Sequence, residues 1–275
     1  MSDTVHRSTP SWLTKEFFGK IFNDFVSSTK NLEKPVDWDC EIDPLAKVFD
    51  DAVTTVFKVK VTNKVNVKEF FKAYVKIMAS ERSALWSMPI EIRKNICIRE
   101  YQIYNECISE FLAIFKKIDS RVTLPTAYHL GLDPYILVIE DMVTSGYDRY
   151  RRCLSVEECK KVFEDLGKFH AVSYFVHHEL KKDLSKFDNV ITLDFLRNTG
   201  ILKLSYQMFT EVVATWEGCS EFAEKLKEFE PFYYTSIIEA LSENPSGFNV
   251  LNHGDFDRPN YLKNKNKNQN GAFVS

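Results

Sequence analysis

The chain has 275 residues, of which 44% are hydrophobic and 27% are charged, and its formal net charge is -3. This length and composition allow a sizeable core in a two-lobed domain or in two modest domains, and they exclude a largely disordered chain. The small negative charge gives no overall positive field for a polyanion, so we expect no nucleic-acid partner.

The cysteines and the amino-terminal segment bear on the cellular location. The 6 cysteines form no CxxC pair and no set with a His at metal-ligand spacing, which favours a reduced intracellular protein. The polar run from Ser2 to Arg7 lacks the apolar region of a signal peptide, and no uncharged run reaches membrane-spanning length. We therefore predict a cytoplasmic protein without membrane association. The sequence does not indicate an oligomeric state.

The first half of the chain predicts a helix followed by a small mixed lobe. An amphipathic helix begins near Ser11, and its apolar face is formed by Trp12, Phe17, Ile21 and Phe25. The segment from Asn63 to Asn66 suits a hairpin turn between two strands. The expected elements are strands at residues 53–61 and 69–78, a helix over about 92–115, and strands at 126–130 and 135–139.

The second half of the chain has a helical pattern after Gly146. Ser155 to Glu158 form a capping box, which predicts a helix from there to about Glu179. Residues 192–243 continue the helical pattern, and a polar segment at 263–271 precedes the start of a strand. We expect an N-terminal cap helix at residues 1–30, a nucleotide-binding N-lobe at 31–143 and a helical C-lobe at 144–275.

The segment from Leu251 to Leu262 carries the most informative motif. Asp255 and Asn260 are five residues apart, as are the kinase aspartate that accepts the substrate hydroxyl proton and the asparagine that holds a magnesium ion. Asp and Gly are also common in turns, but the apolar segment at 248–251 and the preceding helices favour the functional interpretation. The motif therefore predicts phosphoryl transfer, and we expect His253 to fix the loop through hydrogen bonds.

Lys76 lies in an apolar strand and Glu100 lies on the helix that follows. In kinases a strand lysine held by a helix glutamate contacts the α and β phosphates of ATP, because burial without a counterion would neutralise the lysine. On residue types alone, a lysine reaching solvent and a solvated glutamate are the better interpretation. Together with the Asp255 motif, we favour the functional pair.

Glu140 and Met142 lie at the end of a strand, just before the expected division between lobes. A hinge at this place would offer backbone N–H and C=O groups to the edge of an adenine. The contribution would come from the backbone and not from the side chains. A polar strand end without a ligand is an equally good interpretation of these residue types.

Together with these residues, the order of several segments gives a resemblance to a known family. The chain resembles the ecdysteroid kinase-like family of insects, which is related to choline kinases and aminoglycoside phosphotransferases. The similarity extends over nearly the whole chain. It includes Pro10–Leu13, Tyr74–Lys76, Arg99–Asn105, Glu110-Phe111, Leu137–Met142 with Gly146-Tyr147, Leu166–Ser173, and the His253 loop.

The resemblance implies an α+β, protein-kinase-like fold with a small mixed β-sheet lobe and a larger helical lobe. It also implies ATP- and Mg²⁺-dependent transfer of the γ-phosphoryl group to a hydroxyl of a small molecule, such as an ecdysteroid or a foreign compound. In that interpretation Asp255 is the catalytic base and Asn260 a magnesium ligand. Lys76 is the phosphate-binding lysine and Glu100 is its partner.

Two features differ from the family's pattern. Residues 50–55, which include Thr54 and would cover the phosphates, carry Asp50 and Asp51 where the family usually has a glycine and an asparagine. The family also has Asp-Phe-Gln on the strand after the His-Gly-Asp loop, with the principal magnesium-binding aspartate, and the sequence ends at Ser275 just before it. We expect a C-terminally incomplete kinase. The alternatives are an impaired pseudokinase and a small-molecule-binding protein that does not use ATP.

Overall fold

The computed structural model describes residues 9–30, 35–43, 54–78, 90–118, 120, 122–150, 152–187, 200–242, 247–257, 260–265 and 271–274. Contacts within the chain divide it into two units. One unit consists of Met1–Lys182 with Asn252–Ser275, and the other is Asp183–Leu251. All described strands belong to the first unit, whereas the described helices of the second unit form a pair.

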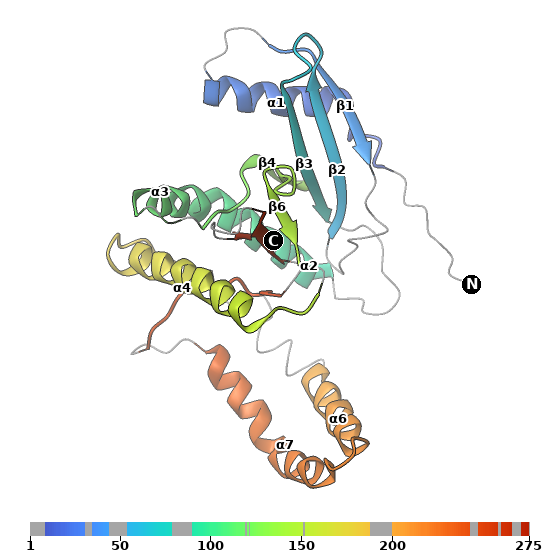
Figure 1. The fold of residues 1–275 in the computed structure, drawn as a ribbon, viewed down its shortest axis with the longest axis vertical. Coiled ribbons are helices and arrows are strands. Elements are labelled where there is room, and N and C mark those ends of the chain that lie inside the picture. Colours follow the sequence, from blue (N-terminus) through green and yellow to red (C-terminus); the bar gives the residue numbers. More distant parts are fainter. Residues whose placement is uncertain are drawn as a thin grey trace, which may run out of the picture. The chain divides into compact units, whose positions relative to one another are not determined.

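An antiparallel sheet of five strands forms the first part of the larger unit (Figure 1). Its spatial order is β1-β2-β3-β5-β4, and every neighbouring pair is antiparallel. The strands are β1 (Trp38–Asp43), β2 (Thr54–Asn63), β3 (Phe70–Met78), β4 (Ala127–Leu132) and β5 (Tyr135–Glu140). The four expected strands are thus confirmed to within a few residues. Strand β1 was not expected, because three of its six residues are acidic and acidic residues are depleted in strands.

The turn between β2 and β3 lies where the sequence predicts it. The side-chain oxygen of Asn63 accepts hydrogen bonds from the backbone N–H groups of Val65 and Asn66, at 2.9 and 3.2 Å. The Asn63 amide nitrogen donates to Glu69 at 2.9 Å. Asn63 therefore closes the hairpin through its side chain and fixes the register of β2 against β3.

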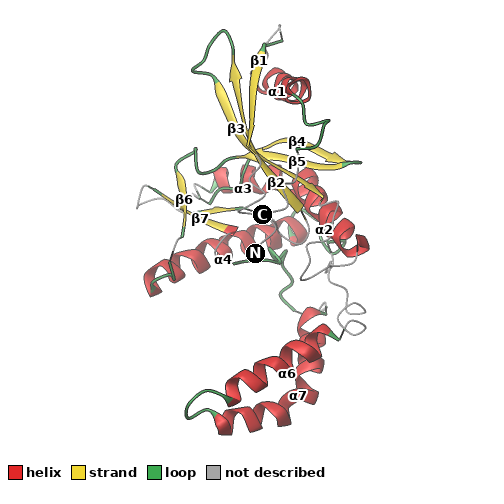
Figure 2. Ribbon diagram, turned by 90° about the vertical axis from the view of Figure 1, so that its right-hand side faces the viewer, coloured by secondary structure: helices red, strands yellow, loops and turns green. Residues whose placement is uncertain are grey.

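Helix α1 (Lys15–Lys30) packs on one face of the sheet (Figure 2). It begins after Thr14, whose hydroxyl oxygen accepts the Phe17 N–H at 3.2 Å. Trp12 therefore precedes the helix and remains 39% exposed, contrary to the predicted apolar face. The buried face of α1 is made by Phe18, Ile21, Phe22 and Val26.

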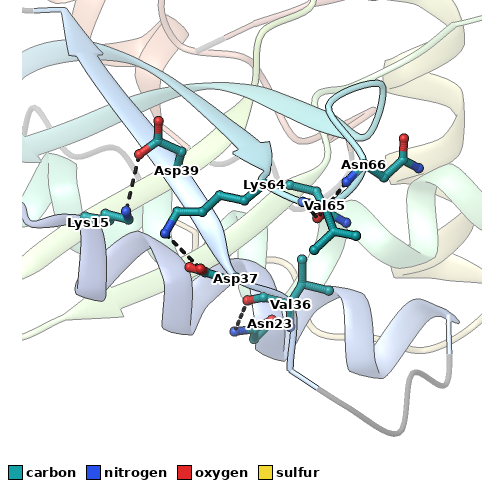
Figure 3. A network of polar contacts seen from close by, with 9 residues as sticks. Lys15, Asn23, Val36, Asp37, Asp39, Lys64, Val65 and Asn66 are labelled. Carbon is teal, nitrogen blue, oxygen red and sulfur yellow. Dashed lines mark hydrogen bonds and ion pairs between the residues drawn. The ribbon is translucent and has the colours of Figure 1, made fainter.

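Polar contacts also attach α1 to β1 and to the segment that leads into it (Figure 3). The Asn23 side chain donates to the Val36 carbonyl at 3.2 Å and accepts the Val36 N–H at 2.8 Å. Lys15 forms an ion pair with Asp39 at 3.3 Å. The exposed ion pair contributes little to stability, whereas the paired hydrogen bonds of Asn23 satisfy a backbone segment outside the sheet.

Side-chain alternation gives the sheet two different faces. Val59 and Val75 belong to the core shared with α1. Residues directly opposite each other in an antiparallel pair point to the same face, and successive residues alternate between faces. Lys76, opposite Val56 on β2 and Leu137 on β5, therefore points away from α1.

The second face of the sheet is next to α2 (Ile90–Ile103), which contacts β3, β4 and β5. The predicted long helix is divided into α2, a π-helical segment η1 (Tyr104–Ile108) and α3 (Ser109–Lys117). Lys182 holds this irregular segment. Its ammonium donates to the Glu106 carbonyl and lies 2.8 Å from the Glu110 carboxylate. The lysine thereby satisfies a backbone acceptor in the π-helical segment.

Helix α4 (Val156–His178) begins at the predicted capping box. The Ser155 hydroxyl oxygen accepts the Glu158 N–H at 3.2 Å, and the Glu158 carboxylate accepts the Ser155 N–H at 2.8 Å. A second antiparallel sheet has the order β6 (Tyr147–Arg149), β7 (Tyr261–Asn264), β8 (Ala272–Phe273). The strand predicted at residue 272 is confirmed, whereas β6 and β7 were not expected.

The second unit consists of α6 (Ile201–Ala214) and α7 (Ser220–Leu241), which contact each other. The Tyr206 hydroxyl donates to the Leu226 carbonyl at 2.7 Å and links the two helices. These helices confirm part of the predicted helical region, and residues 188–199 lie outside the described residues. Over the described parts of the chain, none of the helices has the length and apolar character needed to span a membrane.

Candidate active site

Lys76 and Glu100 form a nearly buried ion pair. The Lys76 Nζ lies 2.7 Å from the Glu100 Oε1, and the two side chains are 10% and 12% exposed. Lys76 has apolar neighbours, Val56 and Leu137, on the adjacent strands. A buried ammonium requires a hydrogen-bonded counterion, and Glu100 supplies it from α2. The pair thus holds the ammonium in a fixed position on the face of the sheet next to α2.

Asp255 and Asn260 are hydrogen bonded within one short loop. The Asn260 Nδ2 donates to the Asp255 Oδ2 and to the Asp255 carbonyl, both at 2.9 Å. Gly254, which precedes Asp255, has a backbone φ of 82°, a value that residues with a side chain rarely adopt. Asp255 is exposed, so its carboxylate is accessible to a hydroxyl group. Because the amide nitrogen of Asn260 is engaged, its amide oxygen is the atom suited to a cation.

His253 links this loop to the end of β8. One ring nitrogen, Nε2, lies 3.3 Å from the Val274 carbonyl, and the Asp255 N–H donates to Nδ1 at 3.4 Å. A carbonyl can only accept, so these contacts assign the neutral tautomer with the proton on Nε2. The sequence prediction that His253 fixes the loop through hydrogen bonds is therefore confirmed.

Electrostatics connect His253 to the Lys76 ion pair. Burial lowers the pKa of His253 from its ordinary value, and the Lys76 charge acts in the same direction. The Val274 carbonyl and the Asp255 and Glu100 charges oppose this shift. His253 is within the field of both members of the ion pair. The structure thus brings the predicted lysine and glutamate into the same region of the larger unit as the His253 loop.

A buried carboxylate that the sequence analysis did not identify anchors the loop. Asp165 on α4 is 0% exposed, and its Oδ2 accepts the Tyr261 hydroxyl at 2.6 Å and the Gly271 N–H at 3.0 Å. Lys168 contributes an ion pair at 3.3 Å. Tyr261, which directly follows Asn260, is the first residue of β7, and Gly271 directly precedes β8, so Asp165 fixes the start of both strands. A signal was present in the sequence, since Asp165 lies in the apolar stripe of α4 beside Val162 and Phe169.

The strand end at Glu140 and Met142 forms a hydrogen-bonded turn. The Glu140 carboxylate accepts the Thr126 N–H at 3.3 Å. The Met142 carbonyl accepts the N–H groups of Ser145 and Tyr147, both at 3.1 Å. This carbonyl therefore already has two donors within the chain. Glu140 lies opposite Ala73 on β3, and it is three residues after Leu137, the β5 residue opposite Lys76.

Asp141, between these two residues, is a second fully buried carboxylate. Its Oδ2 forms an ion pair with Lys58 of β2 at 2.8 Å, and its Oδ1 accepts the Val143 N–H at 3.1 Å. The Lys58 ammonium also lies 5.6 Å from the centre of the Tyr74 ring. No sequence motif marks this side chain. In the structure it ties the strand end to β2.

Thr54 is the first residue of β2 and is 2% exposed. It lies opposite Met78, two positions beyond Lys76 on β3, and on the same face of the sheet. Thr55, the next residue of β2, points to the opposite face of the sheet. The rest of the predicted phosphate-covering segment, residues 50–53, lies outside the described residues.

The donor set suits a hard cation but contains few ligands. Oxygen atoms of Asp255 and Asn260 are the type of ligand that Mg²⁺ prefers. Within the described ranges, no group of three or more His, Cys, Asp or Glu side chains could hold a metal ion. The loop therefore fits a magnesium ion that takes most of its ligands from substrate phosphates and water.

Comparison with known proteins identifies one family. The family model described as "Ecdysteroid kinase-like family" matches residues 49–274. This range contains all the predicted site residues and every described strand except β1. No curated protein matches the chain.

Proposed function

This chain belongs to the ecdysteroid kinase-like family, and we propose that it transfers the γ-phosphoryl group of ATP to a hydroxyl of a small molecule. Family membership indicates a kinase-like phosphotransferase. The observation that carries the proposal is the pair of 2.9 Å hydrogen bonds between Asn260 and the exposed Asp255, next to His253, on which the Lys76 and Glu100 charges act. The acceptor that we propose is an ecdysteroid or a xenobiotic-like compound.

Asp255 is the proposed catalytic base. Its exposed carboxylate would accept the proton of the acceptor hydroxyl as that oxygen bonds to the γ-phosphorus atom, while the bond from phosphorus to the β–γ bridging oxygen breaks and ADP leaves. Two contacts would hold the carboxylate in place, one from the Asn260 amide and one from the His253 ring to the Asp255 backbone. A fixed base loses less entropy in the transition state.

Lys76 is the proposed phosphate ligand. Its ammonium would contact the α and β phosphates, while Glu100, 2.7 Å away, holds it in place on the face of the sheet next to α2. Thr54 would lie at the edge of the segment that covers the phosphates. The backbone of Glu140 to Met142 would contact the adenine edge, although the Met142 carbonyl already accepts two hydrogen bonds.

Asn260 is the proposed magnesium ligand through its amide oxygen. Magnesium would supply positive charge that neutralises the phosphate oxygens. Within the chain, the Asn260 amide nitrogen holds Asp255, so one side chain would orient both the base and the cation. Asp165 would support this arrangement by fixing Tyr261, the next residue.

The test compares phosphoryl transfer with nucleotide binding in Asp255→Ala. We expect the variant to lose transfer to a hydroxylated steroid acceptor and to bind ATP with nearly unchanged affinity, because the base acts on the acceptor hydroxyl. Asp39→Ala, which removes an exposed carboxylate next to α1, is the control and should keep both properties. Retained transfer in Asp255→Ala would exclude Asp255 as the base.

One observation favours a second candidate function, the binding of an apolar small molecule without transfer. Within the second unit, a groove of about 610 Å³ is lined by α6, α7 and their connection. Its apolar lining includes Phe209, Val213, Trp216, Phe222 and Phe229. This volume is in the range of small-molecule sites. Quenching of Trp216 fluorescence by a steroid, unaffected by ATP and without phosphorylated product, would favour this candidate.

A further inference from the structure

We infer that Tyr135 is a positioning residue for nucleotide binding, because its hydroxyl holds the second oxygen of Glu100 and thereby sets the position of Lys76. The inference rests on the proposed kinase function for its effect on ATP. Its structural part, the control of Lys76 by Tyr135, can be tested without any nucleotide. The two claims can therefore fail separately.

The contact geometry places Tyr135 directly behind the ion pair. The Tyr135 hydroxyl donates to the Glu100 Oε2 at 2.5 Å, while the Glu100 Oε1 lies 2.7 Å from the Lys76 Nζ. Each carboxylate oxygen therefore has its own donor, one from β5 and one from β3. A hydrogen bond to a charged group is stronger than a neutral one, and two donors fix the rotation of the carboxylate.

Strand register explains how Tyr135 reaches this position. Lys76 lies opposite Leu137 in the β3–β5 pair, and Tyr135 is two residues before Leu137 on β5. Residues two apart on a strand share a face, so Tyr135 and Lys76 both point toward α2. Glu100 on α2 thus lies between two donors from neighbouring positions of one rigid sheet.

The surroundings keep the tyrosine in its donor state. Tyr135 is 6% exposed. Burial, followed by the negative charge of Glu100, raises the pKa of Tyr135 far above its ordinary value. Cys97 and Tyr104, on α2 and on the π-helical segment, also act on it. The hydroxyl therefore keeps its proton and donates it to Glu100.

The effect extends from the sheet to the nucleotide. Loss of the Tyr135 hydroxyl removes the donor to the Glu100 Oε2, so the carboxylate is less firmly fixed about its terminal torsion and so is the ammonium that it holds. A carboxylate held at both oxygens keeps the ammonium in one position, which reduces the entropy lost when phosphates bind. Removal of one hydroxyl should therefore weaken ATP binding and leave the affinity for the acceptor unchanged.

The first measurement follows Lys76 in the protein without nucleotide. The rate at which an N-hydroxysuccinimide acetate acylates Lys76 is measured by mass spectrometry in the wild-type protein and in Tyr135→Phe. We expect the rate to rise about tenfold in Tyr135→Phe, because a less firmly held Lys76 side chain leaves the ion pair more often and only the amine outside the pair reacts with the ester. The matched control is Tyr128→Phe on β4, whose ring packs against Phe22 and Phe25 on the α1 face of the same sheet.

The second measurement follows the nucleotide. Calorimetry with Mg²⁺ and ATP should show affinity about tenfold weaker in Tyr135→Phe than in the wild type and unchanged affinity in Tyr128→Phe. In turnover assays the KM for ATP should rise and the KM for the acceptor should stay the same. Such a split would not follow from a general loss of stability.

The outcomes separate the two claims. An unchanged Lys76 acylation rate in Tyr135→Phe, or an equal rise in both variants, would overturn the positioning role. A rise confined to Tyr135→Phe with unchanged ATP affinity would overturn the nucleotide part of the inference. Absence of ATP binding in the wild type would overturn the proposed kinase function, and the acylation rates would still decide whether Tyr135 controls Lys76.

Discussion

Tyr261 donates a 2.6 Å hydrogen bond to Asp165, a carboxylate that is 0% exposed and lies 96 residues earlier in the chain. The contact joins helix α4 to the first residue of β7, which directly follows Asn260. Because the buried carboxylate also accepts the Gly271 N–H, one side chain holds both the first residue of β7 and the residue before β8. This long-range contact therefore attaches the end of the loop that carries Asp255 and Asn260 to helix α4.

Tyr261→Phe should destabilise the protein by about 1.5–3 kcal/mol, because Asp165 loses its shortest hydrogen bond in a buried site. Urea unfolding measures the change. Tyr150→Phe is the control, since its ring stacks on Tyr261 with the ring centroids 6.2 Å apart, whereas Asp165 accepts its hydrogen bonds from Tyr261 and Gly271. Equal stability of Tyr261→Phe and the wild type would show that the contact is not important for the fold.

Gly271→Ala should also destabilise the protein. A Cβ at this position would lie 2.2 Å from atoms of the Tyr261 ring and 2.6 Å from the Leu262 carbonyl oxygen, so the strands must separate. Overpacking of this kind costs about 1–3 kcal/mol or more.

A glycine with free space provides the matched control for Gly271. At Gly167 in α4 a Cβ would meet no atom within 4 Å, so Gly167→Ala should stabilise the helix by about 0.5–1 kcal/mol. Chemical denaturation of both variants gives the comparison. Unfolding of Gly271→Ala at the wild-type denaturant concentration would contradict the close approach of Tyr261.

Stability should fall as the pH drops below about 6.5, the ordinary pKa of histidine. Burial lowers the pKa of His129, His170 and His253 in the folded protein, so the unfolded chain takes up protons first. Their contribution is complete above about pH 6.5 and is lost as the pH falls through the lowered pKa values. Thermal unfolding at several pH values checks the direction.

His253 should be responsible for part of this pH dependence. Protonation of its Nδ1 would remove the acceptor of the Asp255 N–H, so His253→Gln should show a weaker loss of stability in acid. Nearby Asp255 and Glu100 favour protonation, and Lys76 opposes it. A wild-type protein that becomes more stable between pH 7 and pH 5.5 would contradict the assignment of neutral histidines.

Local patterns predicted the parts of the site that lie close together in sequence. The five-residue spacing of Asp255 and Asn260 indicated a loop that holds both side chains, and the structure has them hydrogen bonded. The turn at Asn63 and the cap at Ser155 are also local, because side chain and backbone partners are within three residues. Such contacts depend on short-range geometry that a sequence pattern carries.

Long-range partners were harder to predict. Tyr135 and Asp165 act on residues 35 and 96 positions away, and neither has a motif of its own. The sequence placed an apolar strand and an amphipathic helix at these positions but gave no register between them. The register between these elements depends on how all strands of the sheet pair. One of those strands, β1, has a short acidic sequence that does not indicate a strand. The Lys76 pair was predicted because the Asp255 motif indicated a kinase, in which a strand lysine is held by a helix glutamate.

The most direct test of the proposed function is Mg²⁺-dependent ATP binding, measured by calorimetry on the wild-type protein and on Lys76→Met. We predict saturable binding by the wild type that requires Mg²⁺, with affinity at least about tenfold weaker in Lys76→Met, because the charge that would contact the phosphates is removed. Lys64→Met, on the exposed turn after β2, should bind like the wild type. Absence of binding in the wild type, or equal binding by wild type and Lys76→Met, would contradict nucleotide capture at the Lys76 and Glu100 pair.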